Sequence, residues 1–249
     1  METLTELKGY FDTKNQVFFE HFTEIGSTNS YLKENTKNIN QEIHVALADK
    51  QTLGRGRSGR TWYSPDAGNL YISFKFKLSV GFAPVSLIVG AEICQIINKL
   101  SKGDVTPSIK WPNDILLENK KVAGILVETE QDNHNFTYIV GIGINFVLPE
   151  QEEDHWGVLP KVNNLNRVVI AKELSDFFLE LTSKGIPGNW KENWEKVSIH
   201  SNKPIKLITN KGESVNGLYQ GITKNGSLII LTENGLTKEF ASGECSLKY

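Results

Sequence analysis

A short run of glycines and arginines, residues 54–60 (GRGRSGR), constrains this chain more than any other feature of its sequence. Three glycines and three arginines in seven residues offer nothing apolar to a hydrophobic core, so the run must form a surface loop. Glycine lets the backbone approach a ligand closely, and arginine supplies a fixed charge and a planar fork of donors for phosphate or carboxylate. The run therefore predicts either a loop that orders around an anion or a solvated basic loop, such as a nucleic-acid patch.

The sequence that follows predicts a rigid support for this loop. Residues 62–69 are rich in turn formers, and residues 70–78 alternate as a strand does. The loop is therefore expected beside a sheet, which can present it to a ligand. The whole chain has a net charge of only -2 and a pI of about 6.2, so the basic cluster is local. A general nucleic-acid-binding protein is disfavoured for this reason.

The remaining pattern predicts a large domain of strands and helices followed by a small β domain. A chain of 249 residues with 39% hydrophobic content is long enough for both. From about Ser198, glycines punctuate short apolar runs, which predicts four or five short strands joined by hairpins. Before that point, strands are expected at residues 17–22, 43–48, 115–117, 122–127 and 136–146, and helices at residues 4–11, 28–36, 84–100, 170–184 and 188–197.

Composition also bears on the cellular compartment. Cys94 and Cys245 are far apart and lack metal-ligand spacing, so we expect free thiols in a reducing cytosol. The N-terminus has no signal-peptide pattern. The longest uncharged stretch, residues 78–91, is shorter than the roughly 20 apolar residues that span a bilayer. A cytoplasmic protein without a membrane partner is expected.

A second group of polar residues lies at positions 110–114 (KWPND), just before another apolar strand. A short turn at residues 118–120 would fold this segment against residues 121–128 as a hairpin, which would bring Asp114 near Lys121. A surface hairpin with an ordinary salt bridge explains this pair equally well when it is taken alone. Beside an arginine-rich loop, the same pair favours a site for an anion and a metal ion.

Taken together, these motifs resemble those of the biotin protein ligase family. The resemblance rests on residues 27–29 (STN), residues 54–60 with Trp62, residues 110–114 with 121–124, and residues 141–145 (GIGIN). The final segment, residues 243–248, also resembles the last strand of that family, with Lys248 where arginine is expected. The likeness extends from about Phe22 to the C-terminus.

The resemblance implies an α+β fold, in which a mixed sheet flanked by helices, of the class II synthetase-like kind, precedes an SH3-like β-barrel. The implied domains are residues 1–197, which bind biotin and ATP, and residues 198–249. Members of the family make biotinyl-5′-adenylate from biotin and ATP with release of pyrophosphate, and Mg²⁺ usually assists at the polyphosphate. They then transfer biotin to one lysine of a biotin carboxyl carrier protein, as in acetyl-CoA carboxylase.

Roles for individual residues follow from the same resemblance. The catalytic residues implied are Lys121, Arg55, Arg57 and Asp114, and Asp114 is also the implied metal ligand. The implied biotin-binding residues are Ser27, Thr28, Asn29, Gln51, Gly54, Arg55, Gly56, Arg57, Lys121, Gly124 and Gly143. The implied nucleotide-binding residues are Arg57, Arg60, Trp62, Asn113, Lys121, Asn145 and Trp156.

Several of these residues also have a purely structural interpretation. Ser27 and Thr28 suit the start of a helix, where they would only cap it. Trp62 could be a core residue, and this interpretation is favoured for Trp111. Trp156 could cover adenine or anchor a loop, and His155 is expected at the surface.

Other functions remain open at this point. A lipoate ligase shares the implied fold and chemistry, although the basic loop favours biotin. A non-catalytic biotin sensor would not need Arg55, Arg57, Asp114 and Lys121. The segment before Ser27 is too short for a winged helix-turn-helix, so no operator DNA binding is expected. A homodimer through the catalytic domain is a further expectation from the family.

Overall fold

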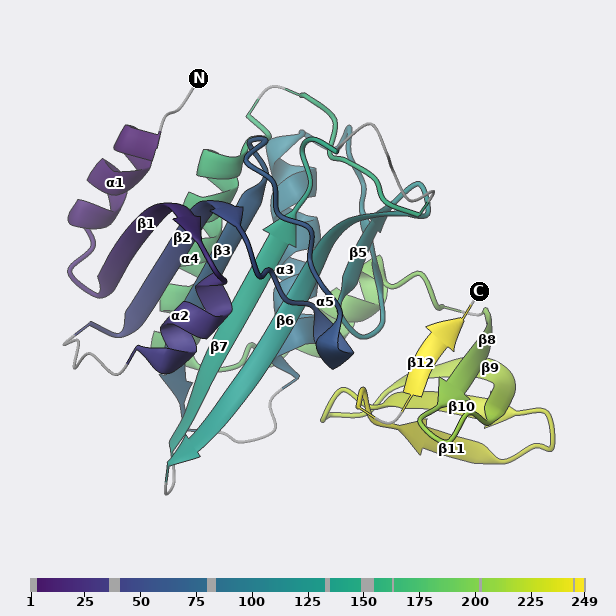
Figure 1. Cartoon of the computed structure of the whole chain (residues 1–249). Coiled ribbons are helices and arrows are strands. Elements are labelled where there is room, and N and C mark those ends of the chain that lie inside the picture. The colour runs from purple at the N-terminus through teal and green to yellow at the C-terminus, as the bar shows by residue number, and fades with distance from the viewer. Residues whose placement is uncertain are drawn as a thin grey trace.

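The computed structural model describes residues 4–35, 41–79, 84–132, 135–148, 155–162, 164–201, 203–243 and 245–248. A mixed sheet in the order β1-β2-β3-β7-β6-β5-β4 forms the larger part of the described residues (Figure 1). Strands β1 and β2 run parallel, and the other neighbours pair antiparallel. The described helices are α1 (Leu4–Asp12), α2 (Thr28–Glu34), α3 (Val85–Leu100), α4 (Arg167–Lys184) and α5 (Trp190–Val197).

The strands of this sheet include every strand expected before residue 198. They are β1 (Val17–Ile25), β2 (Ile43–Gln51), β3 (Leu70–Leu78), β4 (Ser108–Lys110), β5 (Asp114–Leu117), β6 (Lys120–Asp132) and β7 (Asn135–Ile144). Strand β7 ends two residues earlier than expected, because the side chain of Asn69 accepts hydrogen bonds from the backbone N–H groups of Phe146 and Val147. Residues 133–134, between β6 and β7, lie outside the described residues.

The sheet separates a hydrophobic core from the face that carries the polar motifs. In β3, Phe74 and Phe76 point to the core, where their rings lie 4.2 and 5.1 Å from that of Phe178 in α4. Ser73 and Lys75 alternate with them and point to the opposite face. There Lys75 Nζ donates to the carbonyl oxygens of Leu32 and Asn35 and so fixes the end of α2 against the sheet.

Helix boundaries differ slightly from those expected, for local reasons. Helix α2 ends at Glu34, and Thr36, the end that we expected, lies outside the described residues. Helix α4 begins at Arg167 instead of Ile170, because the Asn166 side chain accepts hydrogen bonds from the N–H groups of Val168 and Val169. This cap lies before the apolar stripe from which the helix was predicted.

The C-terminal part forms a five-stranded antiparallel sheet among the described residues, in the order β11-β10-β9-β8-β12. Its strands are β8 (Pro204–Thr209), β9 (Ser214–Ile222), β10 (Leu228–Thr232), β11 (Thr237–Phe240) and β12 (Cys245–Lys248). The predicted mixed sheet with helices and the predicted small β domain are both confirmed.

The two sheets are joined by specific contacts. Residues 198–199 add to the edge of the larger sheet, where Ile199 N donates to Ile109 O at 3.1 Å. Trp111 is buried, as expected of a core residue, and its indole N–H donates to Gly226 O across the junction. Its backbone N–H donates to His200 Nε2 at 2.8 Å. The start of the KWPND motif is therefore fixed by the C-terminal part of the chain.

Candidate active site

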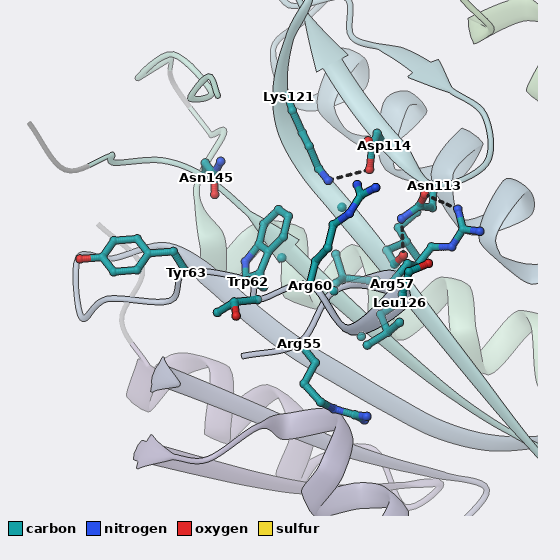
Figure 2. Close-up of a pocket in the computed structure, with 18 of the residues that line it drawn as sticks. Arg55, Arg57, Arg60, Trp62, Tyr63, Asn113, Asp114, Lys121, Leu126 and Asn145 are labelled. Carbon is teal, nitrogen blue, oxygen red and sulfur yellow. Dashed lines mark hydrogen bonds and ion pairs between the residues drawn. The ribbon is translucent and has the colours of Figure 1, made fainter. Parts of the chain in front are cut away.

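A cavity of about 770 Å³ opens on the polar face of the larger sheet and collects almost all the predicted site residues (Figure 2). Of these residues, Gly54 alone does not line it. Gly54 instead allows two segments to meet, because a Cβ at this position would lie 2.3 Å from Trp62 O. The predicted residues that line the cavity are Ser27, Thr28, Asn29, Gln51, Arg55, Gly56, Arg57, Arg60, Trp62, Asn113, Asp114, Lys121, Gly124, Gly143, Asn145 and Trp156.

Glycines form the floor of the cavity. Gly124 on β6 lies opposite Gly143 on β7, and Gly141 lies two residues before Gly143 on the same face. A Cβ at Gly143 would lie 2.4 Å from the indole of Trp62, and one at Gly141 would lie 2.2 Å from Asn29 Oδ1. The absence of side chains here therefore lets Trp62 and the start of α2 lie directly on the sheet.

An irregularity in strand pairing places Lys121 on this floor. Lys121 and Gly124 are three residues apart and would face opposite sides of a regular strand. The register between β5 and β6 shifts at Ile115/Leu116, and a Cβ at Gly124 would lie only 3.2 Å from Lys121 Cε. The ammonium group then lies 2.7 Å from Asp114 Oδ1 and 5.1 Å from the centre of the Trp62 ring. The predicted proximity of Asp114 and Lys121 is confirmed.

The basic loop closes one side of the cavity and is folded on itself. Gly56 N donates to Arg60 O at 2.6 Å and Trp62 N to Gly54 O at 2.9 Å, around Ser58 and Gly59, which both have positive φ. Figure 2 shows Arg60 pointing toward the Lys121–Asp114 pair and Arg55 pointing away from it. Arg55 instead forms an ion pair with Glu128.

Arg57 connects this loop to both parts of the chain. Its guanidinium donates to Asn113 Oδ1 at 3.0 Å and also to the carbonyl oxygen of Ser242 in the C-terminal domain. Burial lowers the pKa of Arg57, as does the charge of Arg60, while the Asp114 carboxylate opposes both. A partly buried cation of this kind gains stability from an anionic ligand.

The segment after β7 closes the opposite side. Lys121 N donates to His155 O, Gly157 N donates to Lys121 O, and Leu159 N donates to Asn145 O. Trp156 is half-buried and lines the cavity next to Lys121, whereas His155 is exposed, as expected. The predicted Trp156 is thus fixed by its neighbours beside the lysine.

Sequence reasoning missed the contribution of the C-terminal domain. Asn210, Ser242 and Gly243 line the cavity, and Asn210 Nδ2 donates to Gly243 O at 2.6 Å. Asn210 and Ser242 belong to no motif, so only the Gly243 segment of the family resemblance pointed to this region. Both cysteines are free, as predicted. Both are also buried, and Cys245 lines the cavity.

Ser27 does more than cap a helix. Its hydroxyl oxygen accepts from Ser30 N at 3.4 Å at the start of α2, and the side chain also lines the cavity.

Trp62 likewise differs from an ordinary core residue: among the described residues its buried indole N–H has no hydrogen-bond partner. A ligand oxygen that accepted this proton would remove the cost of leaving it unsatisfied.

The charge of the cavity suits a polyanion. Among the described residues that line it, Arg55, Arg57, Arg60, Lys110 and Lys121 are cationic, and Asp114 is the one carboxylate. No group of three or more His, Cys, Asp or Glu side chains in the described part of the chain could hold a metal ion. Magnesium that arrives with a nucleotide needs only one or two protein carboxylates, so Asp114 fits such an ion.

A glycine floor under a polar helix start, next to a cationic loop, defines a site for a small acid and a nucleotide phosphate. A sequence profile of the Biotin/lipoate A/B protein ligase family matches residues 22–145, and one of the Biotin protein ligase C terminal domain matches residues 200–248. The bifunctional ligase/repressor BirA of Escherichia coli is 35% identical over 236 residues, which are 90% of this chain and 72% of that protein.

Solved structures agree with these sequence matches. The biotin protein ligase of Aquifex aeolicus in complex with biotin and ATP superposes with a TM-score of 0.72 and 30% identity, over 92% of this chain and 98% of that one. The biotin--[acetyl-CoA-carboxylase] ligase of Paracoccus denitrificans is 29% identical over 74% of this chain and 82% of its own length. The chain therefore belongs to the biotin protein ligase family. Its activity is the formation of biotinyl-5′-AMP and the transfer of biotin to protein.

Proposed function

We propose that biotin lies over the glycine floor with its carboxylate at Lys121, and that ATP lies beside the basic loop. The observation that carries this proposal is the Lys121–Asp114 pair at 2.7 Å, where the floor, the loop and the segment of Trp156 meet. A cation at this junction can contact the carboxylate of one substrate and the α-phosphate of the other.

The first step joins two anions. A biotin carboxylate oxygen attacks the α-phosphorus of ATP, the bond to the β-phosphate oxygen breaks, and pyrophosphate leaves. Most of the catalytic work is therefore alignment and neutralisation of charge. Lys121 supplies charge at the reacting groups, and Arg57 and Arg60 supply it from the loop. Arg55, which pairs with Glu128, would act nearer the biotin end.

The other predicted residues divide between the two substrates. Ser27, Thr28, Asn29 and Gln51 cluster at the start of α2 and bind the ureido head of biotin. Gly124 and Gly143 give the Trp62 ring room against the sheet and so would shape the floor beside biotin, Gly56 would let the loop backbone approach biotin, and Gly54 lets the loop fold. Asn113, Asn145, Trp62 and Trp156 are the proposed nucleotide contacts. Asp114 would hold Mg²⁺, which neutralises phosphate charge when it is bound.

The second step transfers biotin to a lysine of a biotin carboxyl carrier protein, such as that of acetyl-CoA carboxylase. The lysine amine must be neutral to attack the acyl carbon, and AMP leaves as the amide forms. Asp114 lies at the cavity wall and can accept the amine proton once Lys121 has engaged the adenylate. The basic loop and the Trp156 segment would shield the adenylate from water.

Several wider features belong to the same proposal. Residues 1–197 would form the ligase domain and residues 198–249 the C-terminal domain. No helix in the described residues is long and apolar enough to cross a membrane. We propose a cytoplasmic location, consistent with the two free thiols. The predicted homodimer and the predicted lack of operator DNA binding stay predictions, for analytical ultracentrifugation and gel-shift measurements respectively.

Replacing Lys121 tests the assignment directly. Lys121→Ala is expected to lower biotin-dependent pyrophosphate release by about 100-fold or more, because one preorganised charge at the reacting atoms is lost. Lys120→Ala removes the neighbouring exposed lysine and should retain activity within about twofold, as surface substitutions usually do. Equal activity of the two variants, both folded by circular dichroism, would refute the role of Lys121.

A further inference from the structure

A chain of polar side chains runs behind the predicted biotin-head residues and ends at Glu128 on β6, outside the cavity lining. Glu128 Oε2 accepts a hydrogen bond from Asn29 Nδ2 at 3.1 Å and also forms an ion pair with Arg55. Its other oxygen accepts from Lys33 Nζ at 3.1 Å. Burial raises the pKa of Glu128, but hydrogen bonds from Lys33 and Asn29 and the charge of Arg55 outweigh it and leave the pKa below its usual value.

An ionised carboxylate can only accept hydrogen bonds, so it fixes which end of the Asn29 amide faces it. The amide nitrogen must point to Glu128, and it also lies 3.4 Å from the carbonyl oxygen of Leu126, a second group that only accepts. Asn29 Oδ1 must then point the other way, where Ser73 Oγ donates to it at 2.7 Å. Glu128, at the shorter distance, and the carbonyl oxygen of Leu126 therefore determine together where the single proton of Ser73 goes.

The position of the Thr28 hydroxyl proton follows from the same argument. Thr28 Oγ1 lies 2.7 Å from Ser73 Oγ, and because Ser73 gives its proton to Asn29, this contact requires the proton of Thr28. Gln51 Oε1 accepts from the backbone N–H of Thr28 at 2.9 Å and, over the longer distance of 3.1 Å, also from the Thr28 hydroxyl. The Thr28 hydroxyl has its proton held between Ser73 Oγ and Gln51 Oε1, so it can only accept a hydrogen bond from a ligand in the cavity.

At the other end of this series of hydrogen-bonded side chains, the orientation of Gln51 is fixed independently and agrees with that of Thr28. Ser64 Oγ donates to Trp62 O at 2.9 Å and so must accept from Gln51 Nε2 at 3.0 Å. This orients the Gln51 amide with its oxygen toward Thr28. Ser27 Oγ, which accepts from Ser30 N, can donate its own proton into the cavity. A donor at Ser27 and an acceptor at Thr28 complement a ligand that offers a carbonyl oxygen beside an N–H group.

We propose that Glu128 is a positioning residue that sets the hydrogen-bond polarity of this subsite through Asn29 and Ser73, and so selects a cyclic urea or amide head group. The inference rests on the proposed function, because it takes the start of α2 as the place where the biotin head binds. It adds that a carboxylate outside the cavity decides which of its hydroxyl groups accepts a ligand proton.

The test measures the dissociation constant of biotin by calorimetry in four proteins: wild type, Glu128→Met, Ser73→Ala and the double variant. Glu128→Met removes the acceptor at similar size, and we expect about tenfold weaker binding, the usual effect of one lost hydrogen bond to a charged group. Ser73→Ala interrupts the chain and should cost a similar factor. The double variant should also be about tenfold weaker, because Glu128 acts through Ser73.

Glu128→Gln separates the acceptor from the charge. The glutamine oxygen can still accept from Asn29, so this variant should bind biotin within about threefold of wild type, since only the charge is lost. Lys33→Met is the matched control: it removes the exposed partner of the other Glu128 oxygen and should leave biotin binding within about twofold, as an exposed ion pair contributes little. If Glu128→Met does not fold, Glu128→Ala takes its place in the cycle.

The outcomes are distinct. Roughly 100-fold weaker binding by the double variant, the additive result, would overturn the inference, because Glu128 would then act independently of Ser73. Equal losses in Glu128→Gln and Glu128→Met would overturn it in favour of a charge effect through Arg55. Wild-type protein that does not bind biotin would instead refute the proposed function, and the inference with it.

Discussion

Acidification should destabilise the folded protein through one buried side chain, His200. This imidazole is 0% exposed, and its Nε2 accepts the hydrogen bond from Trp111 N at 2.8 Å. Nε2 cannot accept once it is protonated, so the folded state requires the neutral ring. Burial, together with the charges of Lys110 and Lys203, lowers the pKa of His200 from 6.5 to about 3.

The sign and size of the effect follow from these values. The pKa is lower in the folded state, so the unfolded state binds the proton first as the pH falls below 6.5. The stabilisation is complete above pH 6.5 and is lost between pH 6.5 and about 3. Within this window, the free energy of unfolding falls by about 1.4 kcal/mol for each unit by which the pH is lowered. It should therefore fall by roughly 2 kcal/mol between pH 7 and pH 5.

Urea denaturation at pH 7, 6 and 5 measures this loss, with His200→Gln as the comparison. Glutamine can place an acceptor oxygen near the position of Nε2 but does not titrate in this range. The variant should be less stable at pH 7 because the buried ring is lost, yet it should lose about 2 kcal/mol less than wild type on going to pH 5. Parallel pH profiles for the two proteins would refute the reasoning.

Three further substitutions test the site. Gly143→Ala places a Cβ 2.4 Å from the Trp62 ring, so the ring must move, and biotin binding measured by calorimetry should weaken by about tenfold or more at a stability cost of about 1–3 kcal/mol; unchanged binding would contradict the close packing. Arg57→Ala removes the contacts to Asn113 and Ser242, and the KM for ATP should rise by about tenfold, as for other lost hydrogen bonds to a charge. A rise only in the KM for biotin would contradict the placement of Arg57 beside ATP. Trp156→Ala should raise the KM for ATP by about tenfold if the indole stacks on adenine, and an unchanged value would leave it a loop anchor.

Much of the site was predictable because its residues lie in short, local motifs. The turn at residues 118–120 is short enough to force a hairpin, which places residues 114–117 beside residues 120–124 and so brings Asp114 near Lys121. The alternation in β3 likewise predicted a strand beside the basic loop. In both cases the contacts form between residues that are close in the sequence.

The parts that escaped prediction depend on contacts between distant segments. The register shift that turns Lys121 onto the glycine floor leaves no trace in the local pattern. Arg57 meets Ser242, which lies 185 residues away, and Arg55 meets Glu128, 73 residues away. The loop is also closed by its own backbone hydrogen bonds, whereas the sequence indicated order only around an anion. Tertiary packing fixes each of these features, so local propensity could not reveal them.

Pyrophosphate release by the purified protein with ATP and magnesium tests the central claim most directly, with biotin and lipoate compared as the acid substrate. Release that requires biotin, and labelling of a carrier domain that follows it, is the predicted result. Release with lipoate alone would contradict the assignment of the head-group subsite. Release with neither acid would contradict the proposal that Lys121, Asp114 and the basic loop form an adenylating site.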